Sequence, residues 1–404
     1  MIVKNRNNYI LVLLIFLLLC SSYCSKRKDP SSIKTKNLIL DHQEILDGLK
    51  FELVFTKSFE LYPLTRVNPF EKGIMVFHSK GGEGILNLYD FKGNTIKEDI
   101  KLKFDLQDPE SLSSLNCFYD SFSKKLYNTS FPFLKVFDVD LLKTTTVWKI
   151  DPSSGLNSYK APFYYGFHNG PNDAFVLPFF DMLKNTKKYE VFGIGKFKRD
   201  FTGFKSLKTF NFTPKESFKK SGTKRYFSSN YFRQRTDFFP LAVDKNHKKI
   251  YYISNIWKPS FGSLDFSGKE ITYTLNFKKH LLSKENHEDL DIWFKYHSEI
   301  LKRMRNLTIE KKKFESLPCF FNIMVFEEYL IVVTPIYNDQ NNKLAYVFDN
   351  SDLKYLGITY IPSSHGTVEH SYLFDEYYIS ITLIEKEGSM FNQINLYTVK
   401  RKKP

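Results

Sequence analysis

The feature that most constrains this chain is a strand pattern that recurs along most of its length. In the first five units a second strand follows the first and ends in Asp and a turn, as in LNLYDFKGNTI (86–96) and GSLDFSGKEI (262–271). The first strands are six short runs of β-branched and aromatic residues: GIMVFHS (73–79), KKLYNTSF (124–131), AFVLPFF (174–180), KKIYYIS (248–254), EYLIVVT (328–334) and EYYISIT (376–382). The pattern predicts an all-β chain built from a repeated antiparallel unit.

The turn after the second strand has its own chemistry. An Asp at the first turn position accepts backbone N–H bonds, and a Gly three residues later supplies the left-handed conformation that such a turn needs. Asp138 and Asp349 lack that Gly, so their turns are weaker assignments. The pairs that fit are Asp90/Gly93, Asp200/Gly203 and Asp265/Gly268.

Self-similarity at about 50 residues, with four short strands in each unit, is typical of a β-propeller. Six first strands predict a six-bladed β-propeller over residues 45–404. The last unit, INLYTVK (394–400), lacks an outer strand, and LKFELVF (49–55) is expected to supply it and close the ring. A seven-bladed ring, with an irregular blade in 205–235, is the alternative fold, and an open pair of β-sandwiches is the third.

One segment interrupts the strand rhythm. Over residues 284–314, apolar side chains recur every three or four positions, acids stand near the start and Lys and Arg near the end. This spacing and this charge order predict an amphipathic helix inserted between blades four and five. Packing on the propeller is the simpler reading of its apolar face, and docking to a partner or a membrane surface is the other.

The N-terminal region has the pattern of an export signal. Lys4 and Arg6 precede an apolar run over 9–19, which is shorter than the roughly 20 apolar residues of a membrane-spanning helix. Cys20 and Cys24 follow the run, and a polar, basic stretch follows Cys24. We therefore expect a signal peptide over 1–23.

A cysteine placed just after such a run resembles a bacterial lipoprotein signal, and in that family the cysteine becomes the acylated first residue of the mature chain. Cys24 is favoured because the small residues Ser21 and Ser22 precede it in the sequence, although Tyr23, directly before it, is large. Cys20 is the alternative. Ordinary cleavage to a soluble secreted protein is the remaining possibility. Residues 24–44 are then a lipidated tether, and its polar start reads as a flexible linker.

The strand and turn rhythm of 45–400 also resembles uncharacterised six-bladed β-propeller lipoproteins of the bacterial cell envelope. The resemblance implies a lipid-anchored protein at the outer membrane or the periplasmic face. The fold itself does not decide function, because propellers serve binding, catalysis and assembly alike.

Charge and cysteine content exclude some classes of function. The net charge is +15, but the lysines are spread along the chain and no nucleic-acid module occurs, so no nucleic-acid partner is expected. A solvated, lysine-rich surface is the simpler interpretation of the charge, and attraction to acidic envelope glycans or lipid headgroups is the alternative. Beyond the signal, only Cys117 and Cys319 remain; both have apolar neighbours and are expected to be buried thiols, with a long-range disulfide as the alternative. Their separation gives no zinc or redox spacing, and no cofactor is expected.

Two loops carry the candidate ligand-binding residues. YYGFHNGPNDAF (164–175) gathers His168, Asn169 and Asp173 beside aromatic residues, a mixture that suits carbohydrate. His365 and His370, in SSHGTVEHSY, would need a third ligand from another blade to hold a metal, so no metal site is predicted. HEDLD (287–291) lacks the second His of a zinc protease.

These features favour a lipid-anchored propeller that acts as a ligand-binding or scaffolding module and recognises a glycan or an envelope protein through loops on one face of the ring. The alternative function is a carbohydrate-active hydrolase or lyase with an axial pocket, in which His168, Asp173, His365 and His370 would have to converge. An assembly factor that docks a partner through 284–314 is the third. No catalytic residue is assigned.

Overall fold

The computed structural model describes the strands of the repeat and most of the short turns between them. The residues outside the description are 1–33, 41–44, 47–48, 61–65, 81–82, 103–116, 121–122, 124, 131–132, 139–142, 150–159, 163–167, 172–173, 182–189, 199–202, 213–217, 222–223, 228–239, 256–257, 277–318, 338–341, 363–369, 387–388 and 402–404.

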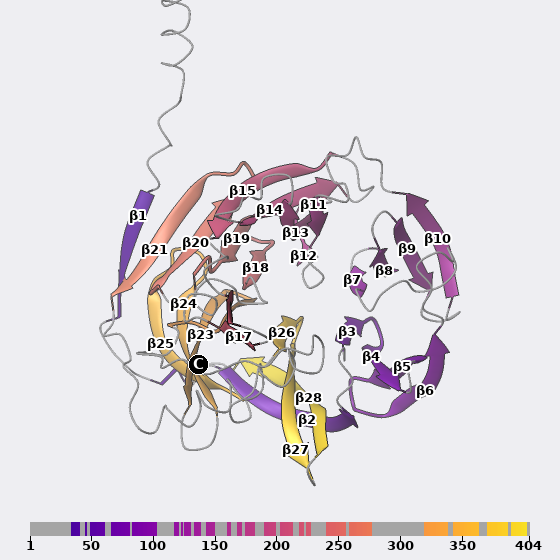
Figure 1. Ribbon diagram of the computed structural model, residues 1–404. Helices are drawn as coiled ribbons and strands as arrows, with labels where there is room; N and C mark the ends of the chain where they lie inside the picture. Colours follow the sequence, from indigo (N-terminus) through magenta and orange to yellow (C-terminus); the bar gives the residue numbers. More distant parts are fainter. Residues whose placement is uncertain are drawn as a thin grey trace, which may run out of the picture.

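Six antiparallel sheets stand around a common centre as the blades of a propeller (Figure 1). From the centre outwards, blade one is β3 (Arg66–Phe70), β4 (Gly73–Lys80), β5 (Glu83–Asp90) and β6 (Thr95–Leu102). Blade two is β7 (Cys117–Asp120), β8 (Lys125–Ser130), β9 (Phe133–Asp138) and β10 (Lys143–Lys149). Blade three has a divided inner strand, β11 (Lys160–Pro162) and β12 (His168–Asn169), followed by β13 (Ala174–Asp181), β14 (Glu190–Lys198) and β15 (Lys205–Phe212).

The other three blades repeat the plan. Blade four is β18 (Leu241–Asp244), β19 (Lys249–Tyr252), β20 (Ser260–Asp265) and β21 (Glu270–Asn276). Blade five is β22 (Asn322–Phe326), β23 (Tyr329–Tyr337), β24 (Lys343–Asp349) and β25 (Tyr355–Ile361). Blade six is β26 (His370–Phe374), β27 (Tyr377–Lys386), β28 (Ser389–Arg401) and β2 (Leu49–Glu60).

The six-bladed prediction is confirmed. Residues 205–235, where the seven-bladed alternative places a further blade, contribute β15 and a two-stranded hairpin of β16 (Phe218–Ser221) and β17 (Lys224–Phe227). The helix predicted over 284–314 lies outside the described residues and stays a prediction. No helix among the residues that the structure describes is long and apolar enough to cross a membrane.

The ring closes where the sequence predicts. β2, from the N-terminal side, pairs antiparallel with β28, from Leu49 opposite Arg401 to Glu60 opposite Phe391, with an irregularity between Leu53 and Phe55. The first and last parts of the propeller thus share one sheet. Closure leaves no blade with a missing outer strand.

The chain before β2 follows the rim of three blades, and we call residues 34–60 the belt. β1 (Lys34–Ile39) pairs parallel with β21 of blade four. Ile45 then bridges Ile358 of blade five, where the Leu46 N–H donates to the Ile358 carbonyl at 2.6 Å. β2 completes blade six. The structure therefore places a strand within residues 24–44, where the sequence favours a flexible linker.

Antiparallel order divides the connections between two faces of the ring. The turns between the first and second strands and between the third and fourth strands lie at one face, which we call the turn face. The connections between the second and third strands and between successive blades begin and end at the other, which we call the loop face. The long connections 213–240 and 277–321 both join blades.

The predicted aspartate turns at Asp90, Asp265 and Asp349 are present at the turn face, and those after Asp138 and Asp200 lie outside the described residues. Asp90 Oδ1 accepts the N–H groups of Lys92 and Asn94, each at 2.8 Å, and Gly93 has φ +87°. Hydrogen bonds from the Asn94 side chain and from backbone N–H groups hold the pKa of Asp90 below its usual value. The Asp349 turn lacks the Gly, and Leu353 takes the left-handed conformation there instead, with φ +63°.

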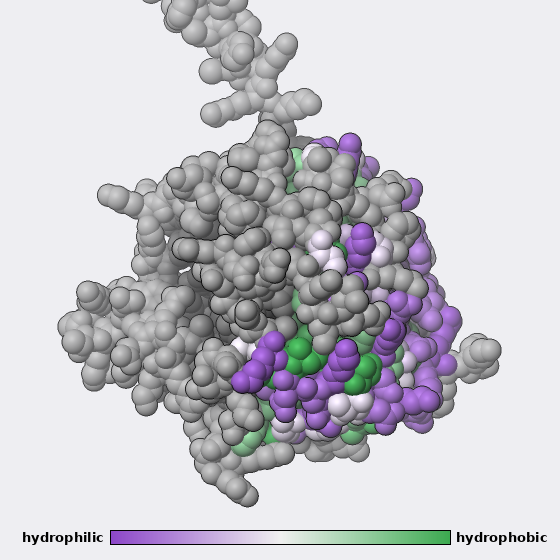
Figure 2. Space-filling view, turned by 90° about the vertical axis from the view of Figure 1, so that its right-hand side faces the viewer, coloured by the Kyte–Doolittle hydropathy of each residue, from purple (hydrophilic) through white to green (hydrophobic). Residues whose placement is uncertain are grey.

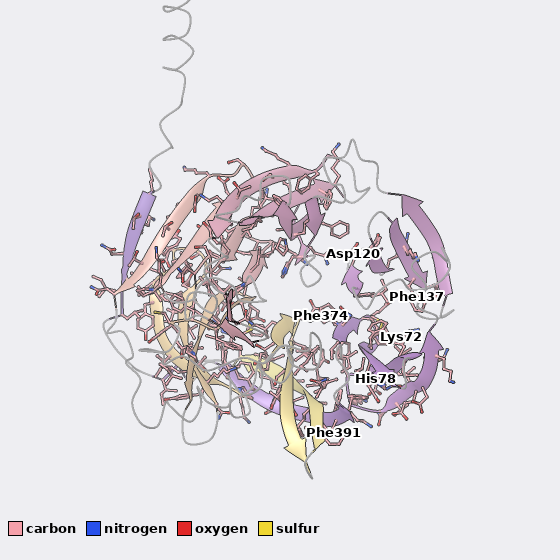
Figure 3. All side chains as sticks on the ribbon, viewed as in Figure 1. Lys72, His78, Asp120, Phe137, Phe374 and Phe391 are labelled. Carbon is pink, nitrogen blue, oxygen red and sulfur yellow. The ribbon has the colours of Figure 1, made fainter. Side chains whose placement is uncertain are left out.

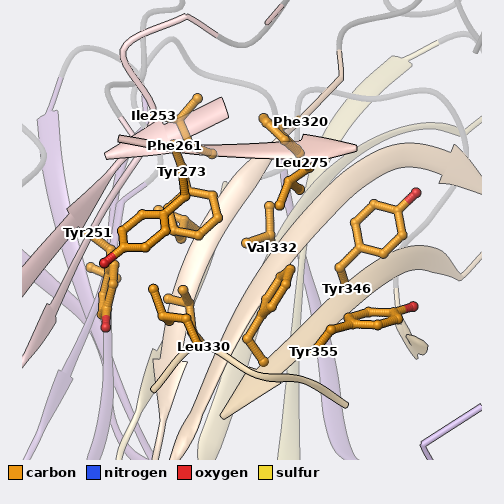
Figure 4. Close-up of a cluster of buried hydrophobic side chains, with 14 of the residues drawn as sticks. Tyr251, Ile253, Phe261, Tyr273, Leu275, Phe320, Leu330, Val332, Tyr346 and Tyr355 are labelled. Carbon is orange, nitrogen blue, oxygen red and sulfur yellow. The ribbon is translucent and has the colours of Figure 1, made fainter. Parts of the chain in front are cut away.

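The core lies between the blades. Each of the six junctions between neighbouring blades holds a cluster of buried apolar side chains. Figure 4 shows the junction of blades four and five, where Phe261 stacks on Tyr273 with ring centroids 5.2 Å apart. Cys319 is buried in this cluster, as its apolar context predicts. The outer rim is different: Figure 2, turned to the side of blades one and two, shows mainly hydrophilic residues where the chain is described.

Closure by β2 gives a stability prediction. Phe51 packs edge-on against Tyr378, with ring centroids 5.4 Å apart, whereas Leu53 on the same strand is 57% exposed. Phe51→Ala should lower the free energy of unfolding by about 2 to 3 kcal/mol because it leaves a gap at the junction of blades five and six. Leu53→Ala is the control and should change it by less than about 0.5 kcal/mol. Urea unfolding measures both, and equal losses would contradict the assignment of β2 to blade six.

Candidate functional site

The inner strands surround the centre of the ring, with their starts at one face and their ends at the other. β18 lies beside β22, β22 beside β26, β3 beside β7, and β12 beside β18. Each inner strand runs from the loop face to the turn face, because its next connection is a short turn. A ligand site at the centre can therefore use the strand starts at the loop face or the strand ends at the turn face.

The predicted pair His168 and Asn169 forms β12, next to the turn face. His168 is opposite Val176, which packs in the core of blades three and four, and Asn169 is opposite Phe175, in the core of blades two and three. Successive side chains of a strand point to opposite sides. The two residues therefore face different junctions and do not form one binding surface.

His168 is held neutral. Burial disfavours the imidazolium ion, and the positive charge of Lys245 adds to the effect, so the pKa of His168 falls from 6.5 to about 4. Lys245 belongs to the turn between β18 and β19. A neutral imidazole in a junction between blades suits packing and hydrogen bonding more than acid catalysis at neutral pH.

The other predicted residues are not brought to His168 in the part that the structure describes. His370 begins β26 in blade six, across the ring from blade three and at the loop-face end, and only its backbone is described. Asp173 and His365 lie outside the described residues. A ligand-binding role for these residues stays a prediction.

Two buried aspartates on inner strands fix turns. Asp120, on the innermost strand of blade two (Figure 3), accepts the Ser123 hydroxyl at 2.5 Å and the Ser123 N–H at 3.2 Å. Asp244 accepts the His247 N–H at 3.1 Å and lies 2.7 Å from His247 Nδ1. The repeated segments YDSFSKKLY (119–127) and VDKNHKKIY (243–251) carry this turn in the sequence. These carboxylates hold the inner hairpins together.

The loop-face half of the junction between blades five and six is polar, unlike the rest of that core. Asn322 begins β22 and donates from Nδ2 to the Ser371 carbonyl at 2.8 Å and to the Ser371 hydroxyl at 3.3 Å. Asn322 is opposite Val333, and Ser371 is opposite Ser380. The two inner strands are thus joined by side chains at the loop-face end of the centre.

Lys343 adds a buried cation to the same junction. It begins β24, two residues before Ala345, whose side chain packs in the core of blades five and six. The Lys343 side chain is 2% exposed, and Nζ lies 3.6 Å from the centroid of the Phe321 ring. A lysine so deeply buried is rare in proteins, since an ammonium ion loses its hydration there. Its burial therefore depends on contacts with neighbours such as the Phe321 ring.

A row of small polar residues continues from the inner strand to the rim of blade six. Ser371, Ser380, Asn395 and Thr56 stand opposite one another on the four strands, and Thr56 Oγ1 lies 2.9 Å from Asn395 Oδ1. Ser380 is fully buried, and its hydroxyl has no hydrogen-bond partner among the described residues. A buried hydroxyl without a partner is destabilising unless water or a ligand meets it.

We call Asn322, Lys343, Ser371, Ser380 and Asn395 the polar junction. It gathers an ammonium group, two amides and two hydroxyls in one junction, and none of its five side chains is an acid. Within the described ranges, no group of three or more His, Cys, Asp and Glu side chains is placed to hold a metal ion. Sequence reasoning missed the polar junction, and the only signal was the alternation of Ser380 and Thr382 with isoleucines in YISITLI (378–384).

Comparison with known proteins finds only distant similarity, in solved structures. No family model and no curated protein matches the chain. Among solved structures, a Bacteroides fragilis protein described as exported is 10% identical, with a TM-score of 0.42, and the match covers 92% of this chain and 100% of the other. The subtype N11 neuraminidase-like protein of influenza A from a flat-faced bat is 9% identical, with a TM-score of 0.40, covering 90% and 98%. The bat subtype N10 protein is 8% identical, with a TM-score of 0.38, covering 87% and 98%.

The environment of His168 predicts a pH dependence. Because its folded pKa of about 4 lies below the ordinary 6.5, the unfolded chain binds the proton first as the pH falls. The associated stability is present above pH 6.5 and is lost as the pH falls towards 4, by about 2 to 3 kcal/mol. Urea unfolding at pH 7 and pH 4.5 should show a smaller pH dependence in His168→Gln than in the parent chain. An unchanged pH dependence in that variant would contradict the assignment.

Proposed function

We propose that this chain is a lipid-anchored protein of the bacterial cell envelope, at the outer membrane or the periplasmic face, whose propeller binds a ligand or an envelope partner from its loop face. The belt is the observation that carries the proposal. It fastens the chain just after the predicted tether to the rim of blade four, and again to blades five and six. A tether fastened to three blades suits a domain that is held at a surface.

The anchor in this proposal is a lipid on Cys24, with Cys20 as the alternative. Nine residues lie between Cys24 and Lys34, and these ten steps of chain would keep the propeller within about 35 Å of the membrane. Stable attachment takes more than one acyl chain, which an acylated N-terminal cysteine provides. The signal-like run over 9–19 supports export, and with it the envelope location.

The ligand in this proposal is rich in oxygen atoms, and a glycan is the class that fits best. The ammonium of Lys343, the amide of Asn322 and the hydroxyl of Ser380 supply donors for hydroxyl or carboxylate oxygens. β22 and β26 begin at the loop face, where the connections between blades also begin and end.

The alternative, a carbohydrate-active hydrolase or lyase, has less support. Glycoside hydrolysis ordinarily takes two carboxylates that flank the scissile bond. The described acids on the inner strands of blades two and four, Asp120 and Asp244, are bound within turns. The polar junction has lysine, amides and hydroxyls but no acid.

Acylation is directly testable. In cells fed a labelled fatty acid, the parent chain and Cys20→Ala should carry the label, and Cys24→Ala should not. The expected reason is that the acylated cysteine becomes the first residue of the mature chain. Label retained by Cys24→Ala but lost from Cys20→Ala would move the anchor to Cys20, and no label on the parent chain would overturn lipid anchoring.

Ser380 tests the binding site, because loss of its hydroxyl should affect the stability of the fold and the binding of a glycan differently. Ser380→Ala removes a buried hydroxyl without a described partner, so the free energy of unfolding should stay the same or rise by up to about 1 kcal/mol. Binding of the purified chain to an array of envelope glycans should weaken about tenfold, since one hydrogen bond to the ligand is lost.

The matched control is Ser267→Ala, an exposed hydroxyl in a turn of blade four at the opposite face, which should bind as the parent does. Glycan binding that is equal in Ser380→Ala and the parent would remove the polar junction from the proposal. A parent chain that binds no glycan on the array would overturn the ligand class.

A further inference from the structure

The turn face of blades three and four is rich in exposed lysines. Six exposed lysines lie there on blades three and four, at the ends of strands or in the turns between them. We call this set the lysine patch: Lys34, Lys198, Lys205, Lys245, Lys248 and Lys269. None of the six makes an ion pair with another described residue. Their charge is therefore directed to the solvent.

The described acidic side chains at the turn face of blades three and four form ion pairs or hydrogen bonds with residues outside the lysine patch or within their own turn. Asp244 is 1% exposed and is bound to His247. Glu270 pairs with Lys208 and accepts the Tyr252 hydroxyl. Asp265 accepts the N–H groups of its own turn, from Ser267 at 2.9 Å and Lys269 at 2.8 Å. Asp244 is buried, Glu270 is paired with a lysine and Asp265 is half-buried, so the six exposed lysines outnumber the acids at this surface.

The positive charge of the lysines lowers the pKa of neighbouring basic groups. Lys196, next to the patch, has a pKa below its usual value because of burial and then because of the charge of Lys205. Lys245 likewise contributes to the low pKa of His168. The geometry of the turns, with two lysines in the β18–β19 turn and one in the β20–β21 turn, produces this field.

The same face has the opposite character on blades five and six. Its exposed turn residues there include the acids Glu327, Asp352, Asp375 and Glu376, with Lys354 as the exposed lysine among them. The basic residues that end β28 are paired, Lys400 with Glu52 and Arg401 with Glu328. Among these four blades, blades three and four are thus the basic half of the turn face, and blades five and six are the acidic half.

The chain enters the fold on the basic half. β1 runs parallel to β21, with Lys34 opposite Ile271, so its first residue lies at the turn face of blade four. If the chain began at β2, it would enter on blade six, among the acids. The belt instead carries the entry point past blade five to the lysine patch. The direction of β1 thus places the start of the described chain at the same face and on the same blade as the lysine patch.

We propose that the lysine patch lies against the anionic headgroups of the membrane that holds the anchor, so that the loop face and the polar junction point away from it. The proposal rests on the lipid anchor proposed above. A tether of at most about 35 Å keeps the propeller near the surface, where its local concentration is high. Lysines within about one Debye length, roughly 8 Å at physiological salt, are attracted by anionic lipids.

The test compares two probes on blade four of the full processed chain. A fluorophore is placed at Asn246→Cys in the turn face or at Asn276→Cys at the other end of β21, and both positions are exposed. Vesicles contain phosphatidylethanolamine and phosphatidylglycerol, with a nitroxide quencher on a fraction of the headgroups. Labelling of the chain without either substitution gives the background from the native cysteines.

Quenching at Asn246→Cys should exceed quenching at Asn276→Cys by roughly threefold or more. It should fall by about half or more in 1 M salt, where the Debye length is about 3 Å, and in vesicles of phosphatidylcholine alone. Equal quenching at the two positions, or stronger quenching at Asn276→Cys, would overturn the proposed orientation.

A charge-matched pair of variants isolates the patch. Lys198→Gln, Lys245→Gln and Lys269→Gln together should lower quenching at Asn246→Cys, whereas Lys97→Gln, Lys101→Gln and Lys258→Gln together should not. Lys97 and Lys101 lie on the rim of blade one, and Lys258 lies in a loop-face connection. Equal effects of the two triple variants would show that net charge alone acts, which would overturn the role of the patch.

The outcome is separable from that of the anchor. A chain that carries no fatty acid can be added to the same vesicles, where any difference in quenching then depends on charge alone. Loss of the label without loss of the quenching difference would reject the anchor and keep the lysine patch as a membrane-binding surface. The reverse result would keep the anchor and reject the patch.

Discussion

The pairing of β2 with β28 is the interaction on which the rest of the structure depends. A ring of blades is stabilised by the junctions between neighbours, and the junction of blades six and one exists only when the chain returns to its beginning. In that junction Val67 and Ile74 of blade one meet Ile379 and Ile394 of blade six, and Phe55 of β2 packs beside them. The closing strand therefore both completes a sheet and covers a core.

The large aromatic content follows from the same architecture. Radially arranged sheets diverge towards the rim, so each junction is a wedge that wide side chains fill well. The chain has 40 Phe and 25 Tyr, and ring contacts occur in several junctions, such as Tyr127 with Phe175 and Phe261 with Phe348. Where the polar junction replaces such residues with small polar ones and a lysine, packing is given up for hydrogen bonding.

The sequence predicted the second and third strands well because both of their sides are buried and because an Asp turn marks the end of the third strand in most blades. Inner strands such as CFYD (117–120) and LAVD (241–244) were missed, because four residues show too little periodicity to separate them from a loop. β1 was also missed. Its residues are mostly exposed and polar, and only the open edge of β21 makes them a strand.

The candidate site was less predictable than the fold. Histidines and a nearby carboxylate drew attention in the sequence, but strand alternation turns His168 and Asn169 towards different junctions. Ser380 and Thr382 look like the solvent side of an ordinary amphipathic strand, and Lys343 looks like one more surface lysine. These residues are buried because blade five packs against blade six. The strands in contact are far apart in the sequence, so no local pattern reveals the burial.

The way β1 is attached has a mechanical consequence. A pull on the chain ahead of Lys34, directed away from the turn face, acts along the length of the strand. Because β1 and β21 are parallel and in register from Lys34 to Ile39, such a force loads their hydrogen bonds together in shear and does not peel them apart one at a time. Under such a force, β1 would stay paired with β21 at higher loads than a short, exposed strand of six residues suggests.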